Sequence, residues 1–170
     1  AATRGVVRYL HGLGHRKIGF VRLGSPNPVY DLRLDGVRAE CAALGLPAPD
    51  RWLVVGREAV SGRVDELMAR GDLPTAFVGG SDGAAMAMIS ELGRRGVAVP
   101  DHVSVTGFDD QPWAAVQSPP LTTVRVDRDQ MGRYAVRALM DLIQRGSCPE
   151  QITASSDLVI RGSTGPAPAR

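Results

Sequence analysis

Two adjacent acids at the end of an apolar run, Asp109 and Asp110, are the first residues of this chain whose types suggest chemistry. Paired carboxylates carry out acid–base catalysis, bind metal ions or form the floor of a polar pocket. Neighbouring side chains on an extended segment point to opposite sides, so these two are poorly placed to share one substrate. We predict that Asp109 accepts hydrogen bonds in a binding pocket. The alternative is that both acids only stabilise turns, where aspartate is favoured.

Arg33 is a second candidate, because it falls in the first turn of a predicted helix, after the loop GSPNP at 24–28. Its guanidinium is a forked donor that matches vicinal hydroxyls or a carboxylate. Pointing along the start of the helix, it would reach a pocket beside that helix. The alternative is a solvated helix face that Arg33 shares with Asp35 and Arg38.

Patterns for nucleotide binding, metal binding and nucleophilic catalysis are weak. The segment GGSDG at 79–83 fits neither GxGxxG nor GxxxxGK[ST], and Ser81 or Asp82 is expected to cap the following helix, where it can also line a cleft. His11 and His15 are four residues apart but lack the acidic or cysteine partners of a zinc site, so we expect a structural role. No GxSxG elbow or Cys–His pairing is present. We therefore predict no enzymatic activity, no metal and no cofactor.

The composition is that of a soluble globular chain of 170 residues, with 44% hydrophobic and 22% charged residues. A net charge of +2 lacks the basic footprint of a nucleic-acid-binding surface. No apolar run is long enough to span a membrane, and the N-terminus lacks the apolar core of a secretory signal. Cys41 and Cys148 are far apart, which fits a reducing cytosol.

Strand-like apolar runs alternate with amphipathic helix patterns along the chain. Strands are predicted at 17–23, 51–55, 75–79, 102–108, 121–126 and 155–164. Helices are predicted at 2–13, 31–46, 59–70, 81–96 and 127–145. This order predicts a doubly wound parallel α/β sheet, in which ligands bind beyond the carboxyl ends of the strands. The segments that carry Arg33, Ser81 and Asp109 should therefore converge on one cleft.

Four segments together resemble the LacI/GalR family of bacterial transcription regulators, over about residues 2 to 163. They are VRYLHGLGHRKIGFV, RLDGVRAECAALGL, SDGAAMAMISELGRRGVAVPDHVSVTGFDD and PPLTTVRVDRDQMGRYAV. The resemblance implies a two-lobed effector-binding domain with a periplasmic-binding-protein-like (type I) fold, of which this chain holds mainly the C-terminal lobe.

The same resemblance implies how the chain divides between the two lobes. Residues 1–118 would form the C-terminal lobe, and 119–148 a crossover strand and a helix that belong to the N-terminal lobe. Residues 149–164 would return as a strand. Independently of the resemblance, the composition of the tail GPAPAR predicts that residues 165–170 are disordered. The DNA-binding headpiece of the family would be absent from this chain.

The resemblance also implies which residues hold the effector. Arg33 and Asp109 match the family's effector-binding arginine and aspartate. Ser81 stands where sugar-responsive members carry asparagine. Arg57, followed by Glu58, stands near the position of an aromatic residue that stacks on the ligand. This favours either a more polar or anionic effector or a site that has lost sugar stacking.

As a function, the resemblance implies the sensing domain of a cytoplasmic transcriptional regulator, in the role of a repressor. Its partners would be a sugar or related polar metabolite, operator DNA through the headpiece, and a second copy of itself. No membrane is expected among its partners. Trp113 and Val116 are candidate dimer contacts; the alternative is that Trp113 only packs under its own loop. The rival function is a periplasmic sugar-binding protein of a transporter, and an enzyme of the doubly wound fold is a third class.

Overall fold

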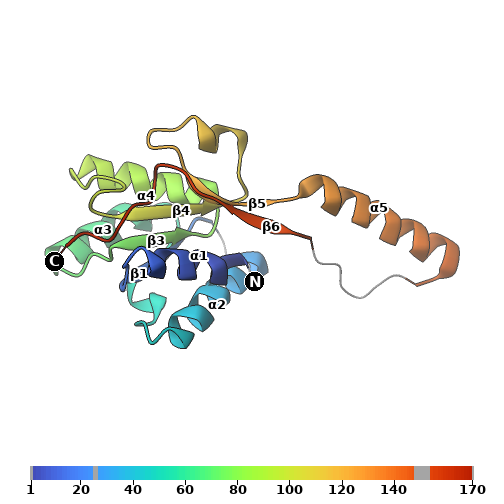
Figure 1. The fold of residues 1–170 in the computed structure, drawn as a ribbon, viewed down its shortest axis with the longest axis horizontal. Helices are drawn as coiled ribbons and strands as arrows, with labels where there is room; N and C mark the ends of the chain where they lie inside the picture. The colour runs from blue at the N-terminus through green and yellow to red at the C-terminus, as the bar shows by residue number, and fades with distance from the viewer. Residues whose placement is uncertain (1, 25–26, 148–153, 170) are drawn as a thin grey trace.

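A six-stranded sheet forms the centre of the computed structural model, which describes residues 2–24, 27–147 and 154–169. The strand order is β2-β1-β3-β4-β5-β6, in which β6 runs antiparallel to β5 and the other neighbours are parallel (Figure 1). The strands are β1 (Ile18–Arg22), β2 (Leu53–Val55), β3 (Ala76–Gly79), β4 (Ser104–Phe108), β5 (Thr122–Val126) and β6 (Ser156–Val159). The prediction of a doubly wound, mostly parallel α/β sheet is therefore confirmed.

Helices cover both faces of this sheet. One face packs against α1 (Ala2–Gly12) and α2 (Pro28–Ala43), and the other against α3 (Ala59–Ala69) and α4 (Asp82–Arg94) (Figure 1). Consecutive residues of a strand belong alternately to the two cores, because side chains point alternately to the two faces of a strand. In β3, Phe77 belongs to the core under α3 and α4, and Val78 to the core under α1 and α2.

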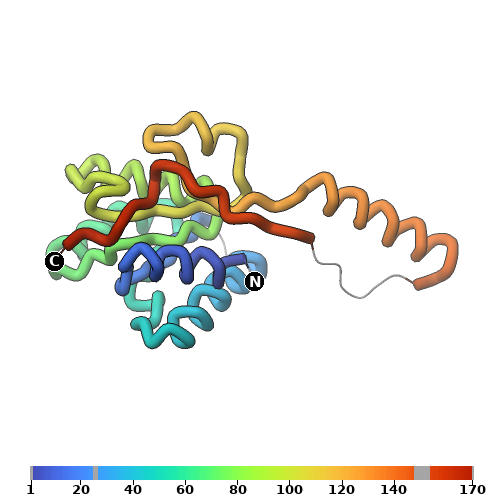
Figure 2. The backbone as a smooth tube through the Cα atoms, viewed as in Figure 1, coloured from blue at the N-terminus to red at the C-terminus, as the bar shows by residue number. Residues whose placement is uncertain are grey.

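The helix α5 (Arg128–Arg145) differs from the others, since it has no buried residue and extends away from the sheet. The chain leaves the body through β5 and re-enters it through β6, which pairs with β5 in the register Val124 to Leu158 (Figure 2). Six large apolar side chains of α5 are exposed: Met131, Val136, Leu139, Met140, Leu142 and Ile143. Within the described ranges, no helix combines the length and the apolarity that a membrane crossing needs.

Several element boundaries differ from the sequence prediction; the last strand, for example, ends at Val159 rather than at residue 164. The starts of α2 and β2 differ for a clear structural reason. The helix α2 begins at Pro28 rather than at residue 31, because Asn27 accepts a hydrogen bond from Val29 N at 2.9 Å and caps the helix, with proline at its first position. Residues Pro49–Trp52 form the 3₁₀ helix η1 and precede the short strand β2, so the predicted strand 51–55 is shorter.

Part of the segment 165–170, which we expected to be disordered, is hydrogen-bonded to the body. Ala167 N donates to Leu13 O at 2.8 Å, and Gly165 O lies 3.1 Å from His15 Nε2. The segment around Gly165 and Ala167 therefore packs on the body, at the end of the sheet that lies away from α5 (Figure 2). Cys148 lies outside the described residues.

Candidate functional site

The carboxyl ends of the parallel strands lie along one edge of the sheet, and the candidate residues follow these ends. Asp109 comes directly after β4, Ser81 follows β3 by two residues, and Arg33 lies in α2, after the loop that follows β1. This is the edge where ligands bind in open α/β sheets. From this edge, β5 continues into α5.

The structure joins Arg33 directly to Asp109. Arg33 Nη2 lies 3.1 Å from Asp109 Oδ1, and Arg33 Nη1 donates to Gly80 O at 2.5 Å. The guanidinium stacks on the ring of Phe108, 3.7 Å from its centroid, so that the side chain is only 16% exposed. Because one end of the fork is held by backbone and one by a carboxylate, the guanidinium is fixed in place with further N–H groups available to a ligand.

Asp109 is held by its backbone as well as by Arg33. Its N–H donates to Val124 O at 2.9 Å, which extends the pairing of β4 with β5 by one residue. Its carbonyl accepts a hydrogen bond from Arg128 Nη2 at 2.5 Å. Its φ of 109° lies in a region that non-glycine residues rarely adopt. Within the described part of the chain, Asp109 Oδ2 has no hydrogen-bond partner, so this oxygen is free to accept from a ligand.

The carboxylate of Asp110 is held by other arginines than that of Asp109. The separation does not come from the alternation along an extended segment that the sequence predicted, because the backbone has positive φ at both acids. Its Oδ2 accepts from Arg125 Nε at 2.6 Å and its Oδ1 from Arg161 Nη2 at 2.7 Å. Burial opposes the charge of Asp110, but the hydrogen bonds from Arg161 and Arg125 outweigh it, and the pKa of the carboxyl is lowered. Both oxygens of Asp110 are therefore occupied, and the two acids do not form a catalytic pair.

Ser81 and Asp82 share the helix start between them. Ser81 Oγ accepts from Ala84 N at 3.2 Å and is the N-cap of α4. Asp82 is fully buried, where it accepts hydrogen bonds from Gln111 N at 2.7 Å and from Thr123 Oγ1. Burial, the first cause, raises the pKa of Asp82 above its usual value.

The role of Asp82 goes beyond the helix cap that the sequence indicated. It connects α4 with β5 and with the loop after Asp110, and so forms part of the support of the site. Its partners are 29 and 41 residues away along the chain, so no local pattern announces these contacts. The sequence signals only that an aspartate follows the segment GGS between a predicted strand and a predicted helix.

Arg57 is not brought into contact with Arg33 or Asp109. It is exposed and lines a cavity of about 530 Å³ with Leu23, Gly24, Gly56 and Glu58, at the carboxyl ends of β1 and β2. It also borders a second cavity, of about 600 Å³, which includes Trp113. The predicted set of four residues therefore divides into a joined pair, a helix cap and a separate arginine.

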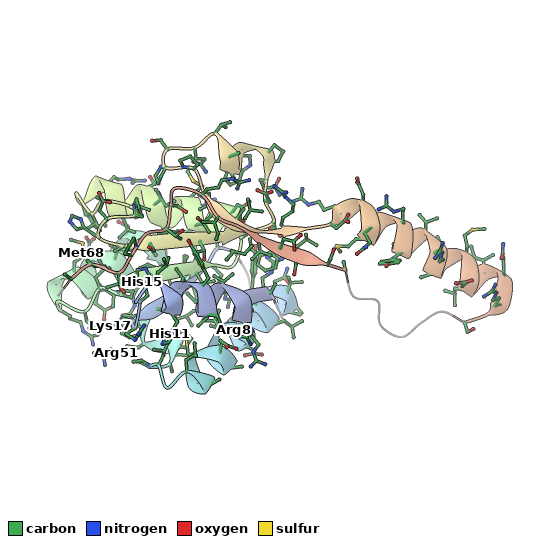
Figure 3. The ribbon with its side chains drawn as sticks, in the orientation of Figure 1. Arg8, His11, His15, Lys17, Arg51 and Met68 are labelled. Atoms are coloured by element: carbon green, nitrogen blue, oxygen red, sulfur yellow. The ribbon has the colours of Figure 1, made fainter. Side chains whose placement is uncertain are left out.

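His15 lies at the opposite end of the body from α5 (Figure 3). It is fully buried, with Nδ1 3.0 Å from Thr75 Oγ1 and Nε2 3.0 Å from Ser104 Oγ. Both ring nitrogens thus have partners within the protein, as the predicted structural role requires. The contacts tie the end of α1 to the starts of β3 and β4.

A family model and several known proteins match this chain over most of its length. Residues 7–164 match the family described as periplasmic binding protein-like domain. The chain is 32% identical over 154 residues to the HTH-type transcriptional repressor PurR of Photobacterium profundum, which covers 88% of this chain and 46% of that protein. It is 30% identical over 160 residues to the ribose operon repressor of Escherichia coli K12, covering 92% and 48%. The chain thus spans about half the length of the curated relatives it matches.

Among solved structures, a sugar-binding transcriptional regulator of the LacI family from Escherichia coli, complexed with phosphate, is similar to this fold. The TM-score is 0.84 at 28% sequence identity, over 96% of this chain and 60% of that one. The similarity therefore extends over nearly the whole of this chain.

Proposed function

We propose that this chain senses a small polar effector for a transcriptional regulator. The premise is that the chain belongs to the periplasmic binding protein-like family, in the form carried by LacI-family transcriptional regulators. In this proposal the regulator is a cytoplasmic repressor, and effector binding changes how its DNA-binding headpiece meets operator DNA. An effector shifts such an equilibrium only by binding one arrangement of the protein more tightly than another.

The observation that carries the proposal is the pair of Arg33 and Asp109 at the carboxyl edge of the sheet. Arg33 offers N–H donors, and Asp109 offers a free carboxylate oxygen beside them. A ligand that both accepts and donates hydrogen bonds satisfies this combination, and vicinal hydroxyls of a sugar do both. An anion alone would meet the carboxylate of Asp109 unfavourably. We therefore propose a sugar or a related polar metabolite.

Ser81 and Arg57 have secondary roles in this proposal. Ser81 Oγ accepts from Ala84 N, and its own hydrogen remains available to a ligand. Arg57, at the end of β2, is proposed to contact a charged or strongly polar group at the far side of the effector. This assigns the choice between neutral and anionic sugars to Arg57.

We further propose that α5 and the crossover segments 119–148 and 149–164 connect to a second lobe. The exposed apolar side chains of α5 support this, since a helix with such a surface normally buries it against another element. Residues 1–118 would then form one lobe, with the effector between the two.

The candidate dimer surface lies on the face of α3 and α4. A cavity of about 600 Å³ there is bordered by Val60, Met86, Ala87, Arg94 and Trp113, among others. Val116, on the same loop as Trp113, is 84% exposed. An exposed tryptophan beside a cavity lined by both apolar and charged side chains suits a contact with a second copy, and two copies suit the two half-sites of an operator.

The test is ligand binding by the protein that contains this chain, measured by titration calorimetry. The probes are D-ribose, D-ribose 5-phosphate and a set of neutral hexoses. Arg33→Ala and Asp109→Asn should each weaken the binding of a responsive probe on the order of 10- to 100-fold, because each removes charged hydrogen bonds. Arg57→Gln should weaken the binding of D-ribose 5-phosphate more than it weakens the binding of D-ribose.

The matched control is Asp35→Asn, which removes an exposed carboxylate of the same helix. It should leave affinity and melting temperature unchanged. Unaltered affinity in both Arg33→Ala and Asp109→Asn would refute the proposed site. Loss of binding accompanied by unfolding would assign these residues to stability instead.

A further inference from the structure

The backbone at Asp109 and Asp110 adopts two consecutive unusual conformations. Their φ angles are 109° and 46°, whereas non-glycine residues rarely have positive φ. Such conformations cost free energy and persist only where the surroundings hold them. The site residue Asp109 therefore depends on whatever restrains its neighbour.

The restraint on Asp110 consists of two arginines from different strands or segments. Arg125 belongs to β5, and Arg161 follows β6 by two residues. The carboxylate between them is 9% exposed, and Arg161 is 16% exposed. Hydrogen bonds between charged groups in such a setting are stronger than exposed surface pairs.

Arg161 is itself anchored to β5. Its Nη1 donates to Leu121 O at 2.8 Å, and its backbone N–H donates to Thr122 Oγ1 at 2.9 Å. Arg161 thus joins Asp110, the start of β5 and the end of the β6 segment. These two segments are the connections between the body and α5 (Figure 2).

We propose that Asp110 is a positioning residue, which holds Asp109 in its site conformation and couples that conformation to β5 and β6 through Arg125 and Arg161. In this arrangement Asp109 contacts the effector, and Asp110 contacts the segments that lead to α5. A change at one acid reaches the other through a single peptide unit. The proposal gives the second acid a role that differs from that of the first.

Only the predicted response of β5 and β6 to the effector rests on the proposed function. The coupling of Asp110 to these strands can be tested in the protein without a ligand. In the ligand-free protein, Asp110→Asn removes the charge, and asparagine still tolerates positive φ. Amide hydrogen exchange should then accelerate by about 10-fold or more at Asp109, in β5 and in β6, because opening of this region becomes easier. Exchange in β1 and β3 should stay unchanged.

Arginine variants distinguish positioning from general stability. Arg161→Met should accelerate exchange in the same segments as Asp110→Asn. The double variant should accelerate it by less than the product of the two single effects, because both substitutions break the contact between Asp110 and Arg161. Arg161→Lys keeps the charge and should restore part of the protection. Should Asp110→Asn fail to fold, Arg125→Met removes one partner that is more than half exposed and tests the same coupling.

The effector part is tested in the protein that contains this chain, with D-ribose and D-ribose 5-phosphate as probes. If one of them binds, Asp110→Asn should still bind it, about 10-fold more weakly, but the ligand should no longer protect β5 and β6 from exchange. Asp109→Asn should bind that probe on the order of 10- to 100-fold more weakly than the unsubstituted protein, because it removes a charged hydrogen-bond acceptor. If no probe binds the unsubstituted protein, the proposed function fails for these probes, while the exchange pattern still decides the structural coupling.

Two results would overturn the proposal. One is exchange in β5, β6 and Asp109 within about 2-fold of the Asp35→Asn control. The other is a uniform acceleration over all strands, which would make Asp110 an ordinary contributor to stability.

Discussion

At Gly107 the backbone of β4 passes so close to the carboxylate of Asp82 that a side chain has no room. A Cβ at this position would lie inside van der Waals contact with Asp82 Oδ1 and 2.8 Å from a methyl group of Leu121. The glycine therefore permits the buried contacts of Asp82 with Thr123 and Gln111. Gly107, two residues before Asp109, supports the site by its lack of a side chain.

Gly107→Ala should accordingly destabilise the protein by about 1–3 kcal/mol, because overpacking forces neighbouring atoms to shift. Urea unfolding at neutral pH measures the change. Gly62→Ala is the matched control, since Gly62 lies in α3 with no atom within 4 Å of the new Cβ. That substitution should stabilise the helix by about 0.5–1 kcal/mol. Equal effects at the two positions would contradict the packing argument.

The parts of the site that the sequence predicts and those that it does not differ in a physical way. Asp109 and Arg33 follow from the rule that parallel strands end at one edge, which needs only local patterns. The pairing of Asp110 with Arg161 joins residues 51 positions apart, and their contact arises from the strand order. Positive φ at two consecutive aspartates likewise depends on tertiary contacts.

Helices and strands were predicted well where the hydrophobic pattern was regular over many residues. The alternation of strands and helices was clear because buried parallel strands are continuous apolar runs. Boundaries were less clear at Pro28, where proline indicates a loop as readily as the first turn of a helix. For the chain end, composition indicated disorder, whereas Gly165 and Ala167 hydrogen-bond to the body through contacts that composition does not reveal.

At the scale of elements, His15 makes the joining of α1, β3 and β4 sensitive to pH. Burial, the main cause, lowers the pKa of His15 below its usual value, and the nearby charge of Arg16 lowers it further. The unfolded chain therefore binds a proton at this residue more readily than the folded chain. The stability that His15 contributes is complete above about pH 6.5, the ordinary histidine pKa, and falls as the pH drops from there toward the folded pKa.

We expect the unfolding free energy to decrease more between about pH 7.5 and about pH 5.5 in the unsubstituted protein than in His15→Gln. Urea unfolding at several pH values measures both slopes. Carboxylates such as Asp72, whose pKa the hydrogen bonds from Arg51 and Lys17 lower to about 2, titrate below this window and leave the comparison unaffected. Parallel slopes for the two proteins would exclude His15 as the cause.

At the scale of the whole molecule, the body and α5 have opposite surface properties. The body buries its apolar side chains in two cores, one on each face of the sheet. The helix α5 exposes its own, with Val136 and Ile143 one above the other, seven residues apart. A second lobe packed on α5 would remove this difference, and the sheet edge with Arg33 and Asp109 would then face that lobe.

Val136→Glu combined with Ile143→Glu tests this arrangement. In a protein that contains the second lobe, the pair should reduce the unfolding free energy by about 1.5–3 kcal/mol for each buried side chain. In the isolated 170-residue chain the same substitutions should change it little, because both side chains are already exposed. Gln144→Glu, at an exposed position of the same helix, controls for the added charge. Equal losses in the two proteins would mean that α5 packs on its own body, and no loss in either would mean that it packs on nothing.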